Sequence, residues 1–335
     1  MTPEELHQFI MELSLIDFTL GVATALGLIS LSKLIFGAVR FVWSNSLRPP
    51  KDLAKTYGSW ALITGGANGI GQALSFQLAS KGLNLIILDR DQAQLETATK
   101  MLHEEFGTRV EVRGIAVDLN RLKKDDIIKA IREGIEGLDV GILINNAGVA
   151  YMYPTFLHEV TPDVVESLLN VNAGAATWAT MAVLPSMMRR KRGAIVNIGS
   201  ASAHVLDAYP LVSIYGATKA YVEHFSKSTS VEYKRYGIDV QCQAPIFVAT
   251  KMTRRRKGSL LVPTPKTWSE ASVRWIGYDE VCVPYWPHYV LSLMGKFLPS
   301  LILNWYFMRL NLHLRDLYSK KVNGASRAED SKKNP

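Results

Sequence analysis

Residues 60–71 read WALITGGANGIG, in which an apolar run leads into a glycine-rich turn. The apolar run suits a buried strand, and apolar residues return at helical spacing over 70–81. Gly65, Gly69 and Gly71 allow a tight turn and let backbone N–H groups approach a pyrophosphate at the helix N-terminus, where the helix dipole also favours an anion. Because many tight turns contain three glycines, this turn gains meaning only from its surroundings.

Short apolar runs alternate with helical stretches after this turn. Such an order indicates an α/β fold, a doubly wound parallel sheet of Rossmann type with helices on both faces. The expected elements are strands at 83–89, 110–118 and 140–146 and helices at 92–106 and 124–135.

Acidic residues close two of the predicted strands. Asp89 lies about 20 residues after the glycine turn, where a carboxylate binds the 2′-hydroxyl of an adenosine ribose. Asp118 closes the next strand and lies either beside the adenine or in a simple turn. A strand, a glycine turn, a helix and an acidic residue in this order predict a dinucleotide site.

Tyr215 and Lys219 lie four residues apart in the run IYGATKAYVEHFSK, whose spacing predicts a helix with both side chains on one face. A phenol has a pKa of about 10, and a nearby ammonium favours the phenolate and lowers that pKa. Tyr215 is therefore a candidate general acid or base. Ser200 or Ser202, at the end of the apolar run GAIVNIGS, could hold a carbonyl oxygen against it.

Five motifs in order carry a resemblance to the short-chain dehydrogenase/reductase family over about residues 58–255. They are Thr64–Gly71, the run NNAG at 145–148, Asn172 in LLNVNAG, the serine after GAIVNIG, and Tyr215-x-x-x-Lys219. Within the family, stretches such as LRPPKDLAKTYGSWALITG and RWIGYDEVCVPYWPH are similar to the very-long-chain 3-oxoacyl-CoA reductases of the endoplasmic reticulum, above all the plant members.

The resemblance implies a role for each catalytic residue. Tyr215 would donate the proton, and Lys219 would hold the nicotinamide ribose and lower the pKa of Tyr215. Asn172 would hold a water that relays protons to Lys219. Family spacing would place the carbonyl-orienting serine at Ser202, but the position directly after the strand favours Ser200, which we expect.

The resemblance also implies NADP(H) as the cofactor, with Val248 and Thr250 against the nicotinamide carboxamide. Asp89 departs from the reductase group, because a carboxylate there repels a 2′-phosphate whereas Arg90 attracts one, so NAD(H) is possible. Asn68 also departs, since the group commonly carries Asp there. The expected cofactor-binding residues are Gly65, Asn68, Gly69, Ile70, Gly71, Asp89, Arg90, Asp118, Asn145, Ala147, Tyr215, Lys219, Val248 and Thr250.

An N-terminal membrane anchor is expected over residues 1–46. The apolar run at 14–42 is long enough to cross a bilayer, which needs about 20 residues. Lys and Arg flank it only on its C-terminal side, so the positive-inside rule places the main domain in the cytosol. A signal peptide would need a basic leader, whereas this leader is acidic. An interfacial or buried helix is the remaining alternative.

The rest of the chain divides into a catalytic domain at 47–255, a substrate-binding and membrane-associated extension at 256–320, and a disordered tail at 321–335. The basic run at 254–257 could meet the phosphates of a coenzyme A, lie against anionic lipid, or be simply solvated. The aromatic segment 285–310 suits an interfacial or re-entrant element or an acyl-chain lid. The ending Lys332-Lys333-Asn334-Pro335 resembles a dilysine signal of endoplasmic-reticulum membrane proteins.

Composition restricts the possible partners. With two cysteines, Cys242 and Cys282, the chain gives no indication of a disulfide framework or a Cys-rich metal site, so we expect no metal. The net charge of +8 comes without a recognition motif for nucleic acid, so we expect no nucleic-acid partner. An anionic membrane surface or an anionic substrate suits this charge better.

The resemblance implies reduction of a long-chain or very-long-chain 3-oxoacyl-CoA to the 3-hydroxyacyl-CoA in fatty acid elongation, with other elongation enzymes as candidate partners. The same site chemistry permits a steroid or other lipid keto/hydroxy oxidoreductase, since fold and catalytic residues do not choose the substrate. A non-catalytic membrane scaffold is an alternative of a different class. The intact Ser200, Tyr215, Lys219 and Asn172 argue against it.

Overall fold

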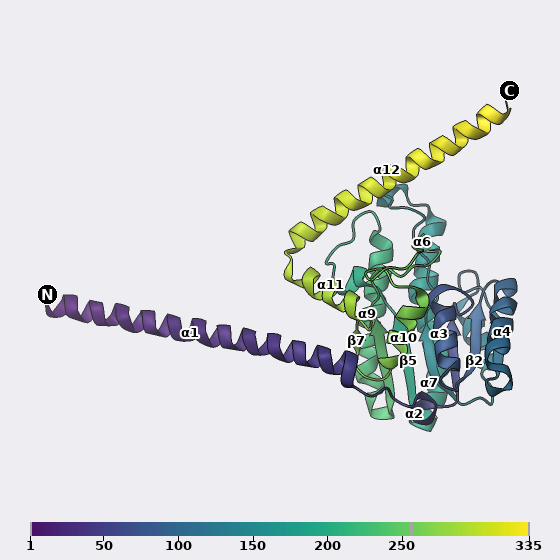
Figure 1. Ribbon diagram of the computed structural model, residues 1–335, viewed down its shortest axis with the longest axis horizontal. Helices are drawn as coiled ribbons and strands as arrows, with labels where there is room; N and C mark the ends of the chain where they lie inside the picture. The colour runs from purple at the N-terminus through teal and green to yellow at the C-terminus, as the bar shows by residue number, and fades with distance from the viewer. Residues whose placement is uncertain (1, 255–256, 334–335) are drawn as a thin grey trace. The chain divides into compact units, whose positions relative to one another are not determined.

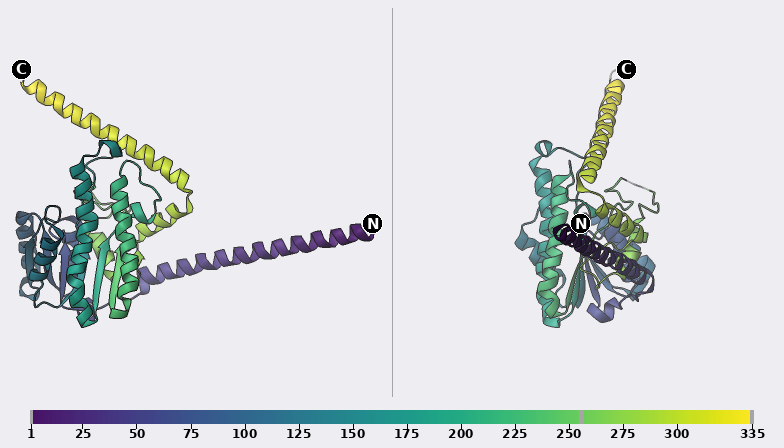
Figure 2. Two further views of the ribbon diagram at one scale, coloured as in Figure 1. Left: turned by 180° about the vertical axis from the view of Figure 1, so that it is seen from behind. Right: turned by 90° about the vertical axis from the view of Figure 1, so that its left-hand side faces the viewer.

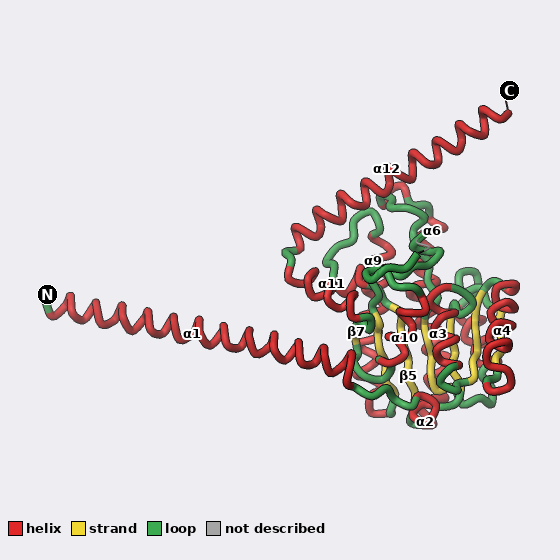
Figure 3. The backbone as a smooth tube through the Cα atoms, in the orientation of Figure 1, coloured by secondary structure: helices red, strands yellow, loops and turns green. Residues whose placement is uncertain are grey.

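The computed structural model describes residues 2–254 and 257–333, and the chain divides into two compact units, Met1–Pro49 and Pro50–Pro335. The second unit holds a parallel sheet of seven strands in the order β3-β2-β1-β4-β5-β6-β7, coloured yellow in Figure 3. This is the predicted doubly wound fold. The strands are β1 (Trp60–Thr64), β2 (Asn84–Asp89), β3 (Val112–Ala116), β4 (Val140–Asn145), β5 (Gly193–Ile198), β6 (Ile238–Gln243) and β7 (Val281–Cys282).

Helices cover both faces of the sheet. One face is packed by α3 (Gly69–Ala79), α4 (Gln92–Phe106) and α10 (Pro265–Arg274), and the other by α5 (Lys124–Gly134) and α7 (Ala175–Arg190). Because both faces are covered, every residue of β1, β4 and β5 is buried, as continuous apolar strands require. Shorter helices are α2 (Leu53–Tyr57), α6 (Pro162–Leu168) and α8 (Ala201–His204), and a long one is α9 (Ser213–Tyr233).

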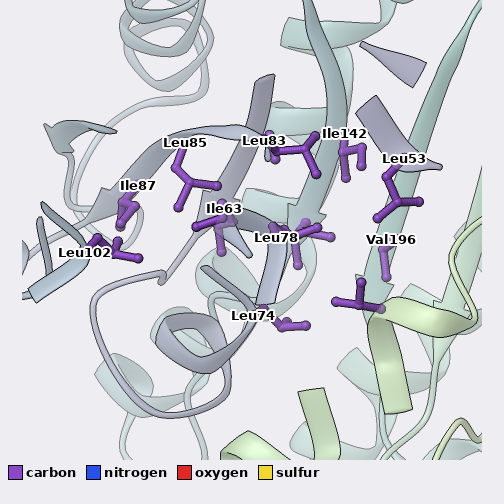
Figure 4. Packing of buried hydrophobic residues seen from close by; sticks show 14 of the residues in the cluster. Leu53, Ile63, Leu74, Leu78, Leu83, Leu85, Ile87, Leu102, Ile142 and Val196 are labelled. Atoms are coloured by element: carbon purple, nitrogen blue, oxygen red, sulfur yellow. The ribbon is translucent and has the colours of Figure 1, made fainter. Parts of the chain in front are cut away.

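The core between the sheet and α3 is built from large aliphatic side chains. Figure 4 shows Ile63 of β1 and Leu85 and Ile87 of β2 beside Leu74 and Leu78 of α3. All five side chains are fully buried. At about 1.5–3 kcal/mol for each large aliphatic side chain removed from water, this packing stabilises the position of α3 on the sheet.

The strand order reverses direction between β1 and β4. The chain first adds β2 and β3 on one side of β1 and then returns to add β4 to β7 on the other. The loops after β1 and β4 therefore leave in opposite directions and open a crevice at the carboxyl ends of the strands. Ligands of open parallel sheets bind at this position.

The N-terminal unit contains one long helix, α1 (Pro3–Val42), drawn in purple in Figures 1 and 2. Thr2 and Glu5 form a capping box at its start. The helical stretch Ile16–Asn45 has a mean hydropathy of 1.9 and no buried residues in its most apolar window, so it is long and apolar enough to cross a membrane. The apolar run predicted at 14–42 covers most of this stretch.

The C-terminal extension forms two helices, α11 (Trp286–Phe297) and α12 (Ser300–Lys333). They meet at a bend of 118°, visible at the left of the yellow segment in Figure 1, and together pass the same hydropathy test as a broken span or re-entrant loop. The backbone is helical as far as Lys333, where the sequence predicts a disordered tail. Continuing an existing helix costs little, because each added residue gains a hydrogen bond without a new nucleus. The side chains of the predicted dilysine signal lie outside the described residues.

Removing residues 1–45 should leave the second unit folded, because its first strand begins only at Trp60 and the two cores that line the sheet lie within this unit. The unfolding temperatures of the truncated chain and of the intact chain, measured by circular dichroism in detergent, should agree within a few degrees. A fall of more than about 4 °C, which for a domain of this size corresponds to about 1 kcal/mol or more, would show that the first unit contributes to the fold.

Candidate active site

A cavity of about 470 Å³ lies in the crevice at the carboxyl ends of the strands. Its walls come from the glycine turn, the ends of β2, β4 and β5, helix α9 and the loop after β6. Three predicted site residues, Gly71, Asn145 and Asn172, are not among its lining residues. The predicted residues that line it are Gly65, Asn68, Gly69, Ile70, Asp89, Arg90, Asp118, Ala147, Ser200, Tyr215, Lys219, Val248 and Thr250.

The glycine turn packs directly against the first turn of α3. A Cβ atom on Gly71 would overlap the Gly65 carbonyl oxygen and lie 2.5 Å from Asn146 Nδ2. Gly65 itself has a φ of 63°, in the left-handed region that favours glycine. Gly71 therefore acts by permitting close packing, and the backbone N–H groups at the start of α3 are left facing the cavity, where a pyrophosphate would fit.

Asn146 holds this turn from the side of β4. Its Nδ2 donates to the carbonyl oxygens of Thr64 and Gly65 at 3.2 and 2.9 Å, and its backbone N–H donates to Thr64 Oγ1. Sequence reasoning named its neighbour Asn145 instead. Asn146 also lines the cavity, and its place in the run NNAG at the end of a predicted strand was the available signal for it.

Asn145 points into the interior rather than into the cavity. Its Nδ2 donates to Asn197 Oδ1 at 2.7 Å, and Asn197 Nδ2 donates to Ser226 Oγ on α9 at 2.8 Å. These buried polar groups join β4, β5 and α9 in one chain of hydrogen bonds. The structure thus places Asn145 where it orients the helix that carries Tyr215, away from the cofactor cavity.

Asp89 is anchored at the wall of the cavity. Its carboxylate accepts hydrogen bonds from the backbone N–H of Ala67 at 3.2 Å and of Arg90 at 2.8 Å. Arg90 is exposed at the cavity rim. Asp118 accepts from the backbone N–H of Asn120 at 2.9 Å, so it forms a turn and lines the cavity at once.

Ser200 follows β5 and caps α8. Its Oγ accepts from the Ser202 backbone N–H at 3.1 Å and from the Ser202 hydroxyl at 2.9 Å. Of the two serines, only Ser200 lines the cavity. Tyr215 of α9 also lines the cavity, and Ser200 lies near enough to its phenol to lower the pKa of that group. This pair presents two hydroxyl groups to whatever occupies the cavity.

The electrostatics of Tyr215 differ from the prediction that Lys219 lowers its pKa. Burial raises the pKa of Tyr215, and the hydrogen bond with Ser200 offsets only part of that rise. Lys219 Nζ instead donates to the Ile198 carbonyl at 2.8 Å and lies 6.0 Å from the centre of the Tyr215 ring. Desolvation by burial outweighs the distant ammonium. Tyr215 is therefore held in its protonated form, which suits a proton donor.

Lys219 is itself buried in the wall of the cavity. Burial lowers its pKa to about 8, because a low-dielectric environment disfavours the ammonium. A site for an anionic ligand would reverse part of this effect, since phosphate charge nearby favours the charged amine. Lys219 is thus charged at neutral pH but close to the point where it loses its proton.

Asn172 lies in a π-helical turn, Leu169–Gly174, between α6 and α7. Its side chain accepts from the Val149 backbone N–H at 2.8 Å and donates to the Val149 carbonyl and to Thr218 Oγ1. A Cβ on Gly148 would lie 3.4 Å from Asn172 Oδ1 and 3.7 Å from Lys219 Nζ. Asn172 therefore lies near Lys219 without a direct bond, and it fixes the loop after β4 to α9.

His288 of α11 is a further residue that the sequence reasoning missed. Its Nδ1 accepts from the backbone N–H of Ile246, a lining residue, at 3.2 Å, and its Nε2 bonds the Leu261 carbonyl. The ring is fully buried, and burial lowers its pKa to about 4, so the imidazole is neutral. His288 thereby holds the loop after β6 that forms one wall of the cavity.

Comparisons with known proteins agree with this architecture. The family model described as short chain dehydrogenase matches residues 59–259. A very-long-chain 3-oxoacyl-CoA reductase-like protein of Arabidopsis thaliana is 39% identical over 87% of this chain and 94% of its own length. The very-long-chain 3-oxoacyl-CoA reductase of Rattus norvegicus is 37% identical over 79% of this chain and 83% of its length.

Two further similarities bear on activity. A human protein named inactive hydroxysteroid dehydrogenase-like protein 1 is 36% identical over 84% of each chain. The crystal structure of a short-chain dehydrogenase from Sphingobium yanoikuyae in complex with NADPH is 30% identical, with a TM-score of 0.58 over 70% of this chain and 94% of the other. Its cofactor shows that a relative of this fold holds a nicotinamide dinucleotide.

Replacing Tyr215 with Phe should lower the turnover number at least about 100-fold, because general acid catalysis contributes that much or more. NADPH affinity should stay within a few-fold, since only one hydroxyl is lost. Tyr221→Phe is the matched control: Tyr221 lies on the same helix and its hydroxyl meets Thr177 outside the cavity. If Tyr215→Phe kept more than about a tenth of wild-type turnover, Tyr215 would not be the proton donor.

The pH profile of kcat/KM for the reduced cofactor should fall as pH rises through about 8. This ratio reports ionisations of the free enzyme, and the lowered pKa of Lys219 means that its ammonium is charged below about 8 and neutral above. In Lys219→Arg the residual activity should lose this decline, because a guanidinium stays charged. A wild-type profile that stays flat to about pH 10 would contradict the assignment of Lys219 to the cofactor.

Proposed function

This chain belongs to the short-chain dehydrogenase family of oxidoreductases, and from that premise we propose that it reduces a very-long-chain 3-oxoacyl-CoA to the 3-hydroxyacyl-CoA with NADPH, as a step of fatty acid elongation. The observation that carries the proposal is that Ser200 and Tyr215 line the same cavity, with the serine near enough to lower the pKa of the Tyr215 phenol. When a carbonyl oxygen lies between two hydroxyl groups, a hydrogen bond from one can polarise the carbonyl while the other donates the proton.

Each catalytic residue has a distinct task in this reaction. The bound nicotinamide cofactor supplies the hydride. Ser200 donates a hydrogen bond to the substrate carbonyl oxygen and holds it against Tyr215, which transfers its proton to that oxygen. Lys219 binds the cofactor ribose and carries positive charge into the site, while Asn172 keeps the loop after β4 in place and holds a relay water beside Lys219.

The C-terminal extension supplies the substrate wall in this proposal. Asn311 of α12 donates to the Pro210 carbonyl at 2.8 Å, Arg315 pairs with Glu159, and Tyr318 stacks on Tyr153 with ring centres 4.1 Å apart. These contacts join α12 to the loop after β4 and to the segment between Ser200 and Tyr215. Exposed apolar residues at the bend, among them Phe297 and Leu301, then face the lipid from which a long acyl chain would arrive.

A membrane location follows from the same proposal. The apolar stretch Ile16–Asn45 anchors the chain, and basic residues after it keep the catalytic unit in the cytosol. The terminal dilysine sequence would retain the protein in the endoplasmic reticulum. Other elongation enzymes are the partners we propose there. Recovery of the intact chain in the soluble fraction without detergent would contradict this part of the proposal.

Two other functions compete with the reductase. A steroid or other lipid ketone fits the same hydroxyl pair, and the name of the human relative favours a non-catalytic member of the family. The experiment is to purify the chain in detergent and follow NADPH and NADH oxidation with 3-oxoacyl-CoAs of several chain lengths and with ketosteroids. Turnover of long 3-oxoacyl-CoAs above ketosteroids is expected; turnover of ketosteroids alone, or of nothing, would overturn the assignment.

Cofactor choice should depend on two adjacent residues with opposite charges. Asp89 is held in place by backbone N–H groups and stays near the 2′ position, which weakens the preference for NADPH, whereas Arg90 can pair with a 2′-phosphate. Asp89→Ser should therefore sharpen the NADPH preference in kcat/KM, and Arg90→Ala should reverse it. Arg132→Ala, an exposed change on α5, is the control. A wild type that favours NADH more than about tenfold, or about 1.4 kcal/mol, would sink this proposal.

A further inference from the structure

A second cavity of about 1040 Å³ lies beside the first and has no part in the chemistry described above. One wall is a face of α3, the opposite walls are α4 and the start of α10, and the loop after β6 borders the end nearest the active site. We refer to it as the basic groove. The lining residues that bear on its function are Gln72, Phe76, Glu105, Lys251, Arg254 and Lys266.

The basic groove opens into the cofactor cavity at one end. Asn68, Gly69, Thr250 and Lys251 line both cavities. A Cβ on Gly69 would lie only 3.7 Å from Thr250 Cγ2, so the glycine turn and the loop after β6 touch at this junction. A ligand in the groove can therefore extend past Thr250 toward the catalytic pair.

The groove carries an excess of positive charge. Three of its lining side chains are cations, namely Lys251, Arg254 and Lys266, and one, Glu105, is a carboxylate. Among the side chains that the structure describes, none of the three cations forms an ion pair with a carboxylate. The guanidinium of Arg254 lies over the Tyr318 ring, 5.3 Å from its centre, which leaves its charge uncompensated. Uncompensated cations along a concave surface favour a ligand with several phosphates.

Lys251 lines both cavities and can serve the cofactor, but the dinucleotide cofactor does not account for Arg254 and Lys266. Its adenosine end belongs with Asp89, Arg90 and Asp118, which line the first cavity and not the groove. Lys266 and Arg254 line the groove and not the first cavity. Arg254 and Lys266 are exposed side chains and are thus available to a second phosphate-bearing ligand that binds together with the cofactor.

We propose that the basic groove binds the phosphorylated adenosine end of the coenzyme A thioester. The inference rests on the proposed function and adds to it the direction in which the substrate lies. Coenzyme A carries a pyrophosphate and a 3′-phosphate for the cations, and its adenine can cover Phe76 and the half-exposed Met101. The pantetheine arm then passes Thr250 to place the 3-oxo group at Ser200 and Tyr215. The acyl chain leaves on the far side, toward α11 and α12.

The first test compares two thioesters of the same 3-oxoacyl group, one on coenzyme A and one on pantetheine, which has no phosphorylated adenosine. Assays in uncharged detergent keep anionic lipid out of the measurement. Lys266→Gln should raise KM for the coenzyme A thioester about tenfold, the loss expected for one charge-assisted phosphate contact, and leave KM for the pantetheine thioester and for NADPH unchanged. Lys129→Gln, an exposed lysine on α5 outside both cavities, is the matched control.

A second variant should act in the opposite direction. Glu105→Gln removes the one carboxylate of the groove and should lower KM for the coenzyme A thioester several-fold, again without effect on the pantetheine thioester. A general loss of folding would lower the turnover of both thioesters and would not lower either KM value, so this improvement separates a binding role from damage. Equal KM values for the two thioesters in the wild type, or parallel changes in both variants, would overturn the proposal while leaving the reductase assignment intact.

Binding can be measured without turnover. Adenosine 3′,5′-bisphosphate, titrated calorimetrically into the NADPH-saturated protein, should bind the wild type and bind Lys266→Gln about tenfold more weakly. Absence of binding to the wild type would overturn the groove assignment whether or not 3-oxoacyl-CoA is reduced. Binding without any thioester reduction would instead keep the groove and refute the proposed reaction.

Discussion

The contact between Gly71 and the Gly65 carbonyl is the constraint on which the rest of the site depends. It lets α3 begin directly after the carboxyl end of β1, so that Gly69 and Ile70 of its first turn line the crevice. Asn146 closes the arrangement by bonding the carbonyl oxygens of Thr64 and Gly65. A side chain at Gly71 would push α3 from the sheet and remove both the turn and the anion site.

Hydrogen bonds between buried polar groups connect this part of the sheet to α9, the helix that carries Tyr215. The chain of hydrogen bonds from Asn145 through Asn197 to Ser226 connects β4 and β5 with α9, and Asn172 connects the loop after β4 with the same helix through Thr218. Each bond contributes only about 1 kcal/mol, but breaking one would leave a buried polar group without a partner. Tyr215 and Lys219 are thus fixed relative to a cofactor site built on a different part of the sheet.

The C-terminal helices α11 and α12 hold loops around the cavity and contribute none of the proposed catalytic residues. His288 holds the loop after β6 through Ile246, and α12 bridges the segments at Glu159 and Pro210 through Arg315 and Asn311. The same loop separates the cofactor cavity from the basic groove. The loop after β6 therefore borders both cavities and is held by α11. For this reason, changes in α11 would affect the active site without a change in a catalytic residue.

The sequence alone determined the doubly wound sheet, the glycine turn, the acid at the end of β2 and the pairing of Tyr215 with Lys219, because these depend on local periodicity and on spacing along one chain segment. Ser200 could be favoured over Ser202 for the same reason, since it directly follows a strand.

The remaining features depend on contacts between segments that are far apart in the sequence, so only the tertiary structure decided them. Asn145 and Asn146 are neighbours in sequence, yet alternate sides of the strand end send one into the core and the other to the glycine turn. Likewise, the net effect on the Tyr215 pKa depends on burial by distant segments, and the basic groove exists only where α3, α4 and α10 meet.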